Sequence, residues 1–163
     1  MIRTRHRRRA RGFTLIELII TVTIVALLAG AAVPLAELTV KRTREHELQS
    51  ALRQIREGID AYKRAWDDKR IARNANETGY PKSLEQLVNG VPDIASPAKA
   101  QIYFLRRIPR DPTYPDASAP AAATWGKRSY ASPPDNPQEG VDVFDVYSLS
   151  ADVALNGVPY REW

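Results

Sequence analysis

The pattern of apolar and polar positions divides the chain into a basic start, one long apolar run and a mixed remainder. From Phe13 to Val33 the run contains a single charged residue, Glu17. About 21 residues at about 1.5 Å of helical rise reach roughly 31 Å, which matches a hydrocarbon core about 30 Å thick. The pattern therefore predicts a membrane-spanning helix at residues 13–33.

The segment before this run, residues 1–12, carries only positive charges. Its arginines are Arg3, Arg5, Arg7, Arg8, Arg9 and Arg11. Because positively charged residues concentrate on the cytoplasmic side of a membrane, we expect a cytoplasmic N-terminus, a single pass through the membrane and a C-terminal part on the opposite side. Removal of this segment would change the formal net charge from +5 to about −1, so the net charge does not indicate a nucleic-acid binder.

Glu17 is unusual in an apolar run. A carboxylate within a spanning helix costs roughly 2.5–3.5 kcal/mol, and less near a helix end, so such a residue indicates a function. No basic residue lies within the run. The compensating charge must come from Arg11, from a new amino terminus made by cleavage, or from another subunit.

The residues from Gly12 to Glu17, GFTLIE, resemble the processing site of type IV prepilins and type II secretion pseudopilins. The resemblance implies that a prepilin peptidase cleaves after Gly12, that Phe13 becomes the N-methylated terminus, and that Glu17 pairs with the amino terminus of a neighbouring subunit. It also implies a homo-oligomeric helical filament, the pseudopilus, built with other pseudopilins on an inner-membrane assembly platform.

Two other interpretations of the N-terminal segment remain open. A secretory signal has a basic start, an apolar core and a small-residue cleavage site, for which Ala29-Gly30-Ala31 would serve. A plain single-span anchor is the second alternative. Neither interpretation gives Glu17 a purpose.

Pro34 follows the apolar run at about the position where the family carries a helix-bending proline. A proline inside a helix removes one backbone donor and clashes with the preceding turn. The resemblance implies a bend at Pro34, where subunit helices unwind on assembly. The alternative is a simple helix stop at the membrane surface.

Residues 34–68 carry one apolar stripe at helical spacing. Its members are Leu48, Leu52, Ile55, Ile59, Tyr62 and Trp66. This spacing predicts that the long helix continues to about Asp68 and that its second half is amphipathic. A two-chain coiled coil would use the same spacing, but the repeat is short and ends in a tryptophan. We therefore expect residues 69–163 to cover the stripe as one periplasmic globular part.

Within this globular part the sequence predicts few regular elements. A short helix should follow Ser83 and end at Asn89-Gly90, and β segments are expected at 129–131 and 141–149. We expect residues 113–124 to form an exposed loop.

Two stretches extend the resemblance to G-type major pseudopilins, namely 80–88 and 102–112. The implied fold is α+β and type IV pilin-like, with the long helix packed on a small antiparallel sheet. Trp163 should lie against that sheet.

G-type pseudopilins commonly hold Ca²⁺ in a loop near the C-terminus. Here Val153 replaces the glycine of the family pattern, and only Asp152 and Asn156 are candidate ligands with side-chain oxygens. Because Ca²⁺ takes six to eight oxygens, usually with several carboxylates, we expect no bound metal and expect the terminal aromatic residues to hold the loop.

Catalysis is not indicated by the residue types. The chain contains no cysteine, His6 lies in the leader and His46 lies among charges on the helix. Asp142 and Asp145 would lie on opposite faces of a strand. We therefore predict a structural subunit and not an enzyme.

Two related roles remain as alternatives, a pilin of a type IV pilus and a DNA-uptake (competence) pseudopilin. The second requires a basic surface on the globular part. The candidates are Arg106, Arg107, Arg110, Lys127 and Arg128. We expect these residues to form an ordinary solvated face.

Overall fold

The computed structural model describes residues 12–163 except 75, 76 and 99. The predicted leader, apart from Gly12, lies outside the described residues. The chain forms two compact units, one ending at Val40 and the other comprising Lys41–Trp163. Helix α1, Leu15–Asp67, contributes to both units.

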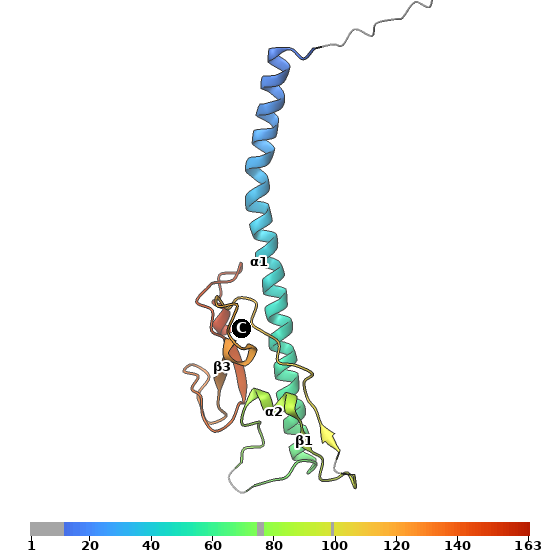
Figure 1. Ribbon diagram of the computed structural model, residues 1–163. Helices are drawn as coiled ribbons and strands as arrows, with labels where there is room; N and C mark the ends of the chain where they lie inside the picture. The colour runs from blue at the N-terminus through green and yellow to red at the C-terminus, as the bar shows by residue number, and fades with distance from the viewer. Residues whose placement is uncertain (1–11, 75–76, 99) are drawn as a thin grey trace, which may run out of the picture. The chain divides into compact units, whose positions relative to one another are not determined.

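The second unit combines helices with short antiparallel strands, which confirms the predicted α+β, pilin-like fold class. Its helix α2 spans Leu84–Asn89, and two 3₁₀ helices, η1 and η2, span Ala121–Thr124 and Tyr160–Glu162. In Figure 1, α2 and the β3–β4 pair lie beside the part of α1 that belongs to this unit.

The strands form two separate two-stranded antiparallel sheets. Strand β1 (Val91–Pro92) pairs with β2 (Gln101–Ile102), and β3 (Trp125–Arg128) pairs with β4 (Asp145–Ser148). In the second sheet Trp125 lies opposite Ser148 and Arg128 lies opposite Asp145. The sequence did not predict the first sheet, whose strands have only two residues each.

The predicted apolar stripe of α1 forms the core of this unit. Its first five members are buried, and Trp66 is partly buried. The residues that cover the stripe are Leu84, Leu87, Trp125, Val143 and Val146, all nearly inaccessible to solvent. Burying a side chain of this size contributes about 1.5–3 kcal/mol, so the stripe anchors the rest of the unit on α1.

Helix α1 ends one residue before the predicted boundary. Lys69 has a left-handed backbone with φ 58°, and the N–H groups of Lys69 and Arg70 donate to the carbonyl oxygens of Trp66 (3.1 Å) and Ala65 (2.9 Å). This pair of bonds is the Schellman arrangement, which satisfies the free carbonyl groups of a helix end.

Helix α2 is confirmed where the sequence places it, and it ends at Gly90 with φ 78°. Ser83 takes the N-cap position, but its side chain makes no capping hydrogen bond. Instead, Gln86 Oε1 accepts the N–H of Lys82 at 2.8 Å.

The predicted β segment at 129–131 is wrong, because the strand is Trp125–Arg128 and residues 130 and 131 form a turn. Asp142 explains the difference. Its Oδ1 accepts the hydroxyl of Ser129 at 2.6 Å and the N–H of Tyr130 at 2.9 Å, and Thr78 donates to Oδ2. The backbone donor of Tyr130 is therefore taken by a buried carboxylate and not by a strand ladder.

The second predicted β segment, 141–149, is too long, since only Asp145–Ser148 is a strand. Before it, Val143 N–H donates to the carbonyl of Pro81 at 2.7 Å. The loop 113–124 also differs from the expectation, because it ends in η1 and buries Thr124.

A second buried carboxylate, Asp111, holds this loop to β4. Ser148 donates to its Oδ2 at 2.5 Å, and both the hydroxyl and the N–H of Thr113 donate to its Oδ1 at 2.6 and 2.7 Å. The N–H of Asp111 in turn donates to Thr124 Oγ1 at 3.1 Å. Hydrogen bonds of this kind allow a carboxylate to remain buried without a cation.

Candidate functional site

Helix α1 begins with a capping box formed by Thr14 and Glu17. The N–H of Glu17 donates to Thr14 Oγ1 at 3.3 Å, and the N–H of Thr14 donates to Glu17 Oε2 at 3.5 Å. Leu18 N–H closes the first helical turn on the carbonyl of Thr14 at 3.1 Å. The Thr-x-x-Glu pattern satisfies two backbone donors that a helix start leaves free. The sequence contains this signal, but the resemblance drew attention to Glu17 alone.

The capping box determines where the Glu17 carboxylate lies. A negative charge in the first turn interacts favourably with the positive end of the helix dipole, by about 0.3–1 kcal/mol at an exposed position. Among the described residues, no donor reaches Oε1 of Glu17. One carboxylate oxygen therefore remains available to a group from outside this segment.

The peptide bond between Gly12 and Phe13 lies just before the helix. Both residues are exposed and neither is helical, and a Cβ atom at Gly12 would have no atom within 4 Å. Exposed, non-helical backbone is the kind of segment that proteases cut. The two predicted processing residues therefore lie together, two residues before the first helical position.

The apolar run presents its side chains outward. Phe13, Leu15 and Leu27 are 81%, 79% and 72% exposed, and α1 contains the one segment in the described part of the chain that is long and apolar enough to span a membrane. The hydroxyls of Thr21 and Thr23 donate to carbonyl oxygens one turn earlier, at 2.9 and 2.8 Å. These threonines thus satisfy their donors within the helix, as a lipid environment requires.

Pro34 lies inside α1, which continues for many residues beyond it. The interpretation of Pro34 as a helix stop is therefore wrong. The bend that the resemblance assigns to this residue stays a prediction.

Residues 7–33 match the prokaryotic N-terminal methylation motif. The motif indicates a type IV pilin-like protein. It implies processing by a prepilin peptidase and assembly into a pilus-like filament, and it is typical of the structural subunits of such filaments. Neither a curated protein nor a solved structure matches the chain.

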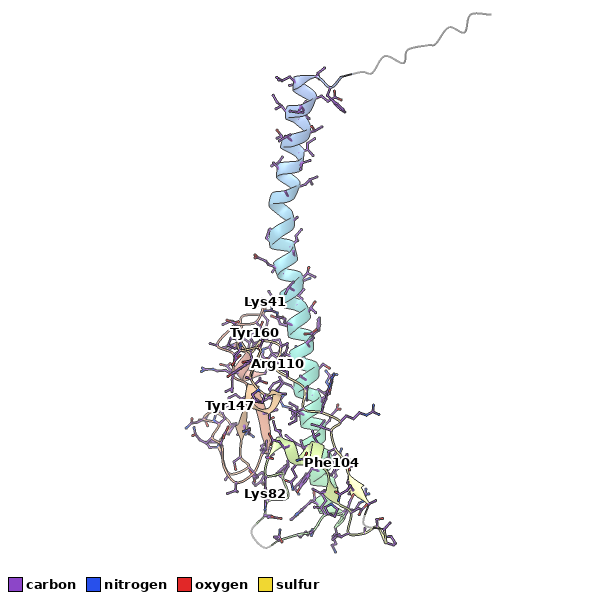
Figure 2. All side chains as sticks on the ribbon, viewed as in Figure 1. Lys41, Lys82, Phe104, Arg110, Tyr147 and Tyr160 are labelled. Carbon is purple, nitrogen blue, oxygen red and sulfur yellow. The ribbon has the colours of Figure 1, made fainter. Side chains whose placement is uncertain are left out.

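The loop with the two weak calcium candidates is held to α1 by protein groups. Lys41 Nζ donates to the carbonyl of Val153 at 2.6 Å, and Glu45 Oε1 accepts the N–H of Leu155 at 2.7 Å and the hydroxyl of Tyr160 at 3.1 Å. Figure 2 labels Lys41 and Tyr160 at this attachment. Burial, with a further contribution from the hydrogen bond to Glu45, raises the pKa of Tyr160 to about 12.

The candidates themselves are engaged only locally. Asn156 Oδ1 accepts the N–H of Val158 at 3.0 Å, and the backbone carbonyl of Asp152 accepts the N–H of Tyr160 at 3.2 Å. Within the described residues, no group of three or more histidine, aspartate or glutamate side chains could hold a metal. The absence of bound calcium stays a prediction.

Arg56 is a residue whose role the sequence did not reveal. Its Nε donates to Asp145 Oδ1 at 2.8 Å, and its Nη2 donates to the carbonyl oxygens of Val146 (3.2 Å) and Trp163 (2.8 Å). One arginine thus joins α1, β4 and the C-terminal residue. Trp163 packs edge-on against Tyr160, with ring centroids 5.3 Å apart, and directly follows η2, which contacts β4.

The five basic residues considered for DNA binding do not form one free stripe. Arg110 donates to the carbonyl oxygens of Ala119 and Asp116, Lys127 pairs with Glu139 at 3.7 Å, and Arg128 lies over the ring of Phe144. Arg106 and Arg107 are exposed. Since three of the five have partners within the fold, their arrangement gives no support to a nucleic-acid surface.

Proposed function

We propose that the protein is a pseudopilin of a type II secretion-like machine, close to the G-type major subunit. A prepilin peptidase cleaves it after Gly12, Phe13 is N-methylated, and the processed subunits assemble from the inner membrane into a periplasmic pseudopilus. The observation that carries this proposal is the exposed Gly12–Phe13 bond directly before a capped, lipid-compatible helix with an acid in its first turn.

Cleavage would create a positive charge that can pair with the Glu17 carboxylate. Cleavage leaves a cationic amino group on Phe13. The Oε1 atom of Glu17 in a neighbouring subunit can accept a hydrogen bond from this group. In a lipid-like environment an ion pair is far stronger than in water, and an unpaired carboxylate is costly. Pairing between subunits would therefore set the register of adjacent α1 helices and reduce the cost of moving Glu17 out of the membrane interface.

Cleavage would also remove the six leader arginines that hold the N-terminus in the cytoplasm. The anchor is then the apolar run alone, which can leave the bilayer for a filament core without dragging a cluster of cations across it. Removal of the leader charges would therefore make it easier for the helix to leave the membrane after processing.

The two stretches that resemble G-type subunits support the type II assignment over a surface pilin. The first contains α2, whose Leu84 and Leu87 are fully buried against α1. The second contains Asp111, which holds the following loop to β4. Both stretches therefore serve as structural parts of the globular unit.

The test is expression of the full chain with a prepilin peptidase and a type II assembly platform. We expect mass spectrometry to find a mature chain that begins at Phe13 with one added methyl group. A chain that begins after Ala31, or one that retains residues 1–12, would exclude the processed-pilin assignment.

Assembly is tested by Glu17→Ala, with Glu37→Ala as a matched control on an exposed acid of the same helix. We expect both variants to be cleaved but only the control to yield sheared fibres. Restored secretion in a strain without its major pseudopilin supports the type II role, whereas surface pili without secretion would assign the protein to a type IV pilus.

A further inference from the structure

A loop near the C-terminus, residues 152–160, is fixed to the end of the second unit where α1 enters it. Lys41, the first residue of this unit, donates to the carbonyl of Val153, and Glu45 one turn later accepts the N–H of Leu155. In Figure 2, Lys41 marks one end of the unit. The position of the loop is therefore set by the first turns of α1 that belong to this unit.

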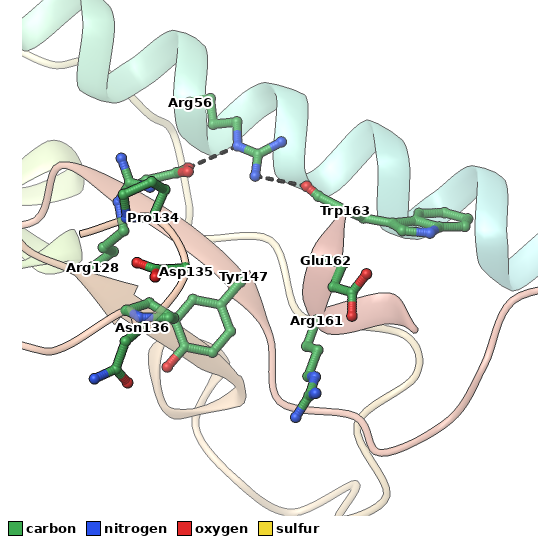
Figure 3. Close-up of a pocket in the computed structure, with 11 residues that line it drawn as sticks. Arg56, Arg128, Pro134, Asp135, Asn136, Tyr147, Arg161, Glu162 and Trp163 are labelled. Atoms are coloured by element: carbon green, nitrogen blue, oxygen red, sulfur yellow. Dashed lines mark hydrogen bonds and ion pairs between the residues drawn. The ribbon is translucent and has the colours of Figure 1, made fainter. Parts of the chain in front are cut away.

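The backbone of this loop is bonded mainly within the protein. The N–H groups of Ala154, Gly157 and Val158 all donate to acceptors within the loop, at 2.9, 3.0 and 3.0 Å. Beyond the loop, Arg56 donates to the carbonyl of Trp163 at 2.8 Å and holds the following segment to α1 (Figure 3). Because these polar groups are paired, the loop can enter apolar surroundings without leaving them unsatisfied.

Three aliphatic side chains of the loop are accessible to solvent. Val153, Leu155 and Val158 are 43%, 40% and 36% exposed, whereas Ala154 is buried. Single exposed aliphatic side chains are ordinary on a protein surface, but three on one short, fixed loop form an apolar patch. Three partly exposed side chains offer far less than the roughly 800 Å² per partner that a stable protein interface buries. An occupant that needs only shallow insertion of a few side chains, such as a lipid surface, fits this patch better.

Two cations flank the loop on α1. Arg42 and Arg44 are exposed, and no ion pair reaches either of them from the residues that the structure describes. At about 100° per residue they lie on opposite sides of the helix face that Lys41 and Glu45 present to the loop. Burial raises the pKa of Tyr160, and the nearby charge of Arg44 opposes this rise. Aliphatic side chains beside unpaired cations are typical of surfaces that lie on anionic lipid.

The apolar run brings a bilayer to this end of the unit. Residues 34–40, between Val33 and Lys41, contain one charged residue, Glu37. Since α1 is helical throughout, at about 1.5 Å per residue, the segment from Val33 to Lys41 covers about 12 Å. The headgroup layer on each side of the hydrocarbon core is roughly 5–8 Å thick. An anchored chain therefore keeps Lys41 near the headgroups, within reach of the long arginine side chains that follow it.

We propose that this loop docks on an anionic phospholipid surface while the subunit is anchored in a membrane. The three aliphatic side chains enter the headgroup layer, and Arg42 and Arg44 bind lipid phosphates on either side of them. Docking gives the second unit an attachment to the bilayer in addition to α1. The inference rests on the anchoring of the chain that the proposed function assumes, and not on cleavage, assembly or the machine that the protein serves.

The experiment places one fluorescent label beside the loop. The chain contains no cysteine, so a single introduced cysteine can carry the label. The full chain is reconstituted in vesicles of phosphatidylcholine and phosphatidylglycerol in equal parts, with a nitroxide quencher on the lipid headgroups. We expect strong quenching at Ala151→Cys, which adjoins the loop, and weak quenching at Ala131→Cys, an exposed alanine elsewhere in the unit. Equal quenching at the two positions would overturn the proposal.

A third label separates docking from anchoring. Ile24→Cys lies in the apolar run and should be quenched by a nitroxide on the lipid acyl chains. If Ile24→Cys is quenched and Ala151→Cys is not, the docking proposal fails and the anchor stands. If Ile24→Cys is not quenched either, the anchoring assumed in the proposed function is wrong, and the docking proposal is overturned with it.

Variants test the chemistry of the contact. Arg42→Gln and Arg44→Gln should each lower the ratio of docked to undocked loop about fivefold, which is the effect of one cation near an anionic lipid surface. Arg64→Gln, at an exposed arginine in the last turn of α1, should leave this ratio unchanged. Asp152→Asn should strengthen docking, because it removes the one acid of the loop. Unchanged docking in both Arg42→Gln and Arg44→Gln would overturn the proposed contact with lipid phosphates.

A second copy of the chain is the competing occupant of the patch. Vesicles of phosphatidylcholine alone should quench the label at Ala151→Cys less than the mixture does, and the quenching should not depend on the ratio of protein to lipid. Quenching that changes with this ratio, and not with the removal of phosphatidylglycerol, would assign the loop to a contact between copies and overturn the lipid assignment.

Discussion

Glu45 provides the sharpest test of how the C-terminal loop is held, because it accepts two hydrogen bonds from groups that no helix pattern links to it. In Glu45→Ala the N–H of Leu155 loses its acceptor, and the hydroxyl of Tyr160, a residue only 2% exposed, loses its own. Hydrogen bonds to a charged group contribute about 1.5–3 kcal/mol, and a buried donor without a partner costs about 1–3 kcal/mol. We expect a total loss of about 2–4 kcal/mol in the free energy of unfolding of this unit.

A double-mutant cycle separates the two bonds. Tyr160→Phe should lower the free energy of unfolding by about 1 kcal/mol, because Glu45 still accepts the hydrogen bond from the N–H of Leu155. In the double variant no buried hydroxyl is left without a partner. The double variant should therefore be less destabilised than the sum of the single variants by about 1–2 kcal/mol. Urea unfolding of the full chain in micelles, followed by tryptophan fluorescence, measures this quantity because Trp66, Trp125 and Trp163 all lie in the second unit.

The contact between Glu45 and Tyr160 should also make the free energy of unfolding depend on pH in the alkaline range. Burial and Glu45 raise the pKa of Tyr160 from 10.0 to about 12, so the unfolded chain releases this proton first as the pH rises. The stabilisation is complete below about pH 10 and is lost as the pH rises towards 12, by up to about 2–3 kcal/mol more in the wild type than in Tyr160→Phe. Glu47→Ala, at an exposed acid near Glu45 on α1, should match the wild type throughout. Additive losses in the cycle, or a Glu45→Ala cost below about 0.5 kcal/mol, would refute the role of Glu45.

Three further predictions concern the helix end, a buried acid and calcium. Lys69→Gly should raise the free energy of unfolding by about 1 kcal/mol, because glycine adopts φ 58° without strain, and Lys69→Ala should not. Burial would raise the pKa of Asp142, but hydrogen bonds from Ser129, Thr78 and Tyr130 N–H outweigh it and lower that pKa, so the stabilisation is present above the ordinary pKa of about 4 and is lost as the pH falls below it. Asp142→Asn should abolish this acid-sensitive part of the unfolding free energy. Added Ca²⁺ should leave the melting temperature unchanged, and saturable stabilisation in calorimetry would contradict this expectation.

Much of α1 was predictable from the sequence because its patterns repeat along the chain. The apolar run and the stripe from Leu48 to Trp66 each depend on several residues at regular spacing, so no single contact decides them. The short helix α2 was predictable from its turn residues. The strands were not, since β3 ends where the N–H of Ser129 donates to the carbonyl of Gln138 and the N–H of Tyr130 donates to Asp142, and neither partner is near in the sequence.

The Thr14–Glu17 capping box could have been predicted from the sequence, because a threonine followed three residues later by a glutamate at the start of an apolar run is a known helix-start pattern. The C-terminal attachment was not visible. Lys41, Glu45 and Arg56 lie on a highly charged helix face, and their partners lie about 90 to 115 residues later in the chain. The spacing of residues along the helix therefore did not distinguish these three residues from the solvated charges beside them.

Glu17 and Glu45 both lie on α1 but differ in their hydrogen-bond partners. Glu45 has its acceptor capacity filled by its own chain, and removing it should change the stability of the second unit. Among the residues that the structure describes, Glu17 is bonded only to Thr14, through long hydrogen bonds of 3.3 and 3.5 Å, and one of its oxygens has no partner there. Its substitution should therefore leave the stability of the subunit nearly unchanged and affect only what happens between subunits. If the proposed pairing of Glu17 with a new amino terminus is right, Glu17→Ala should lose assembly and keep the stability of the second unit, whereas Glu45→Ala should do the reverse.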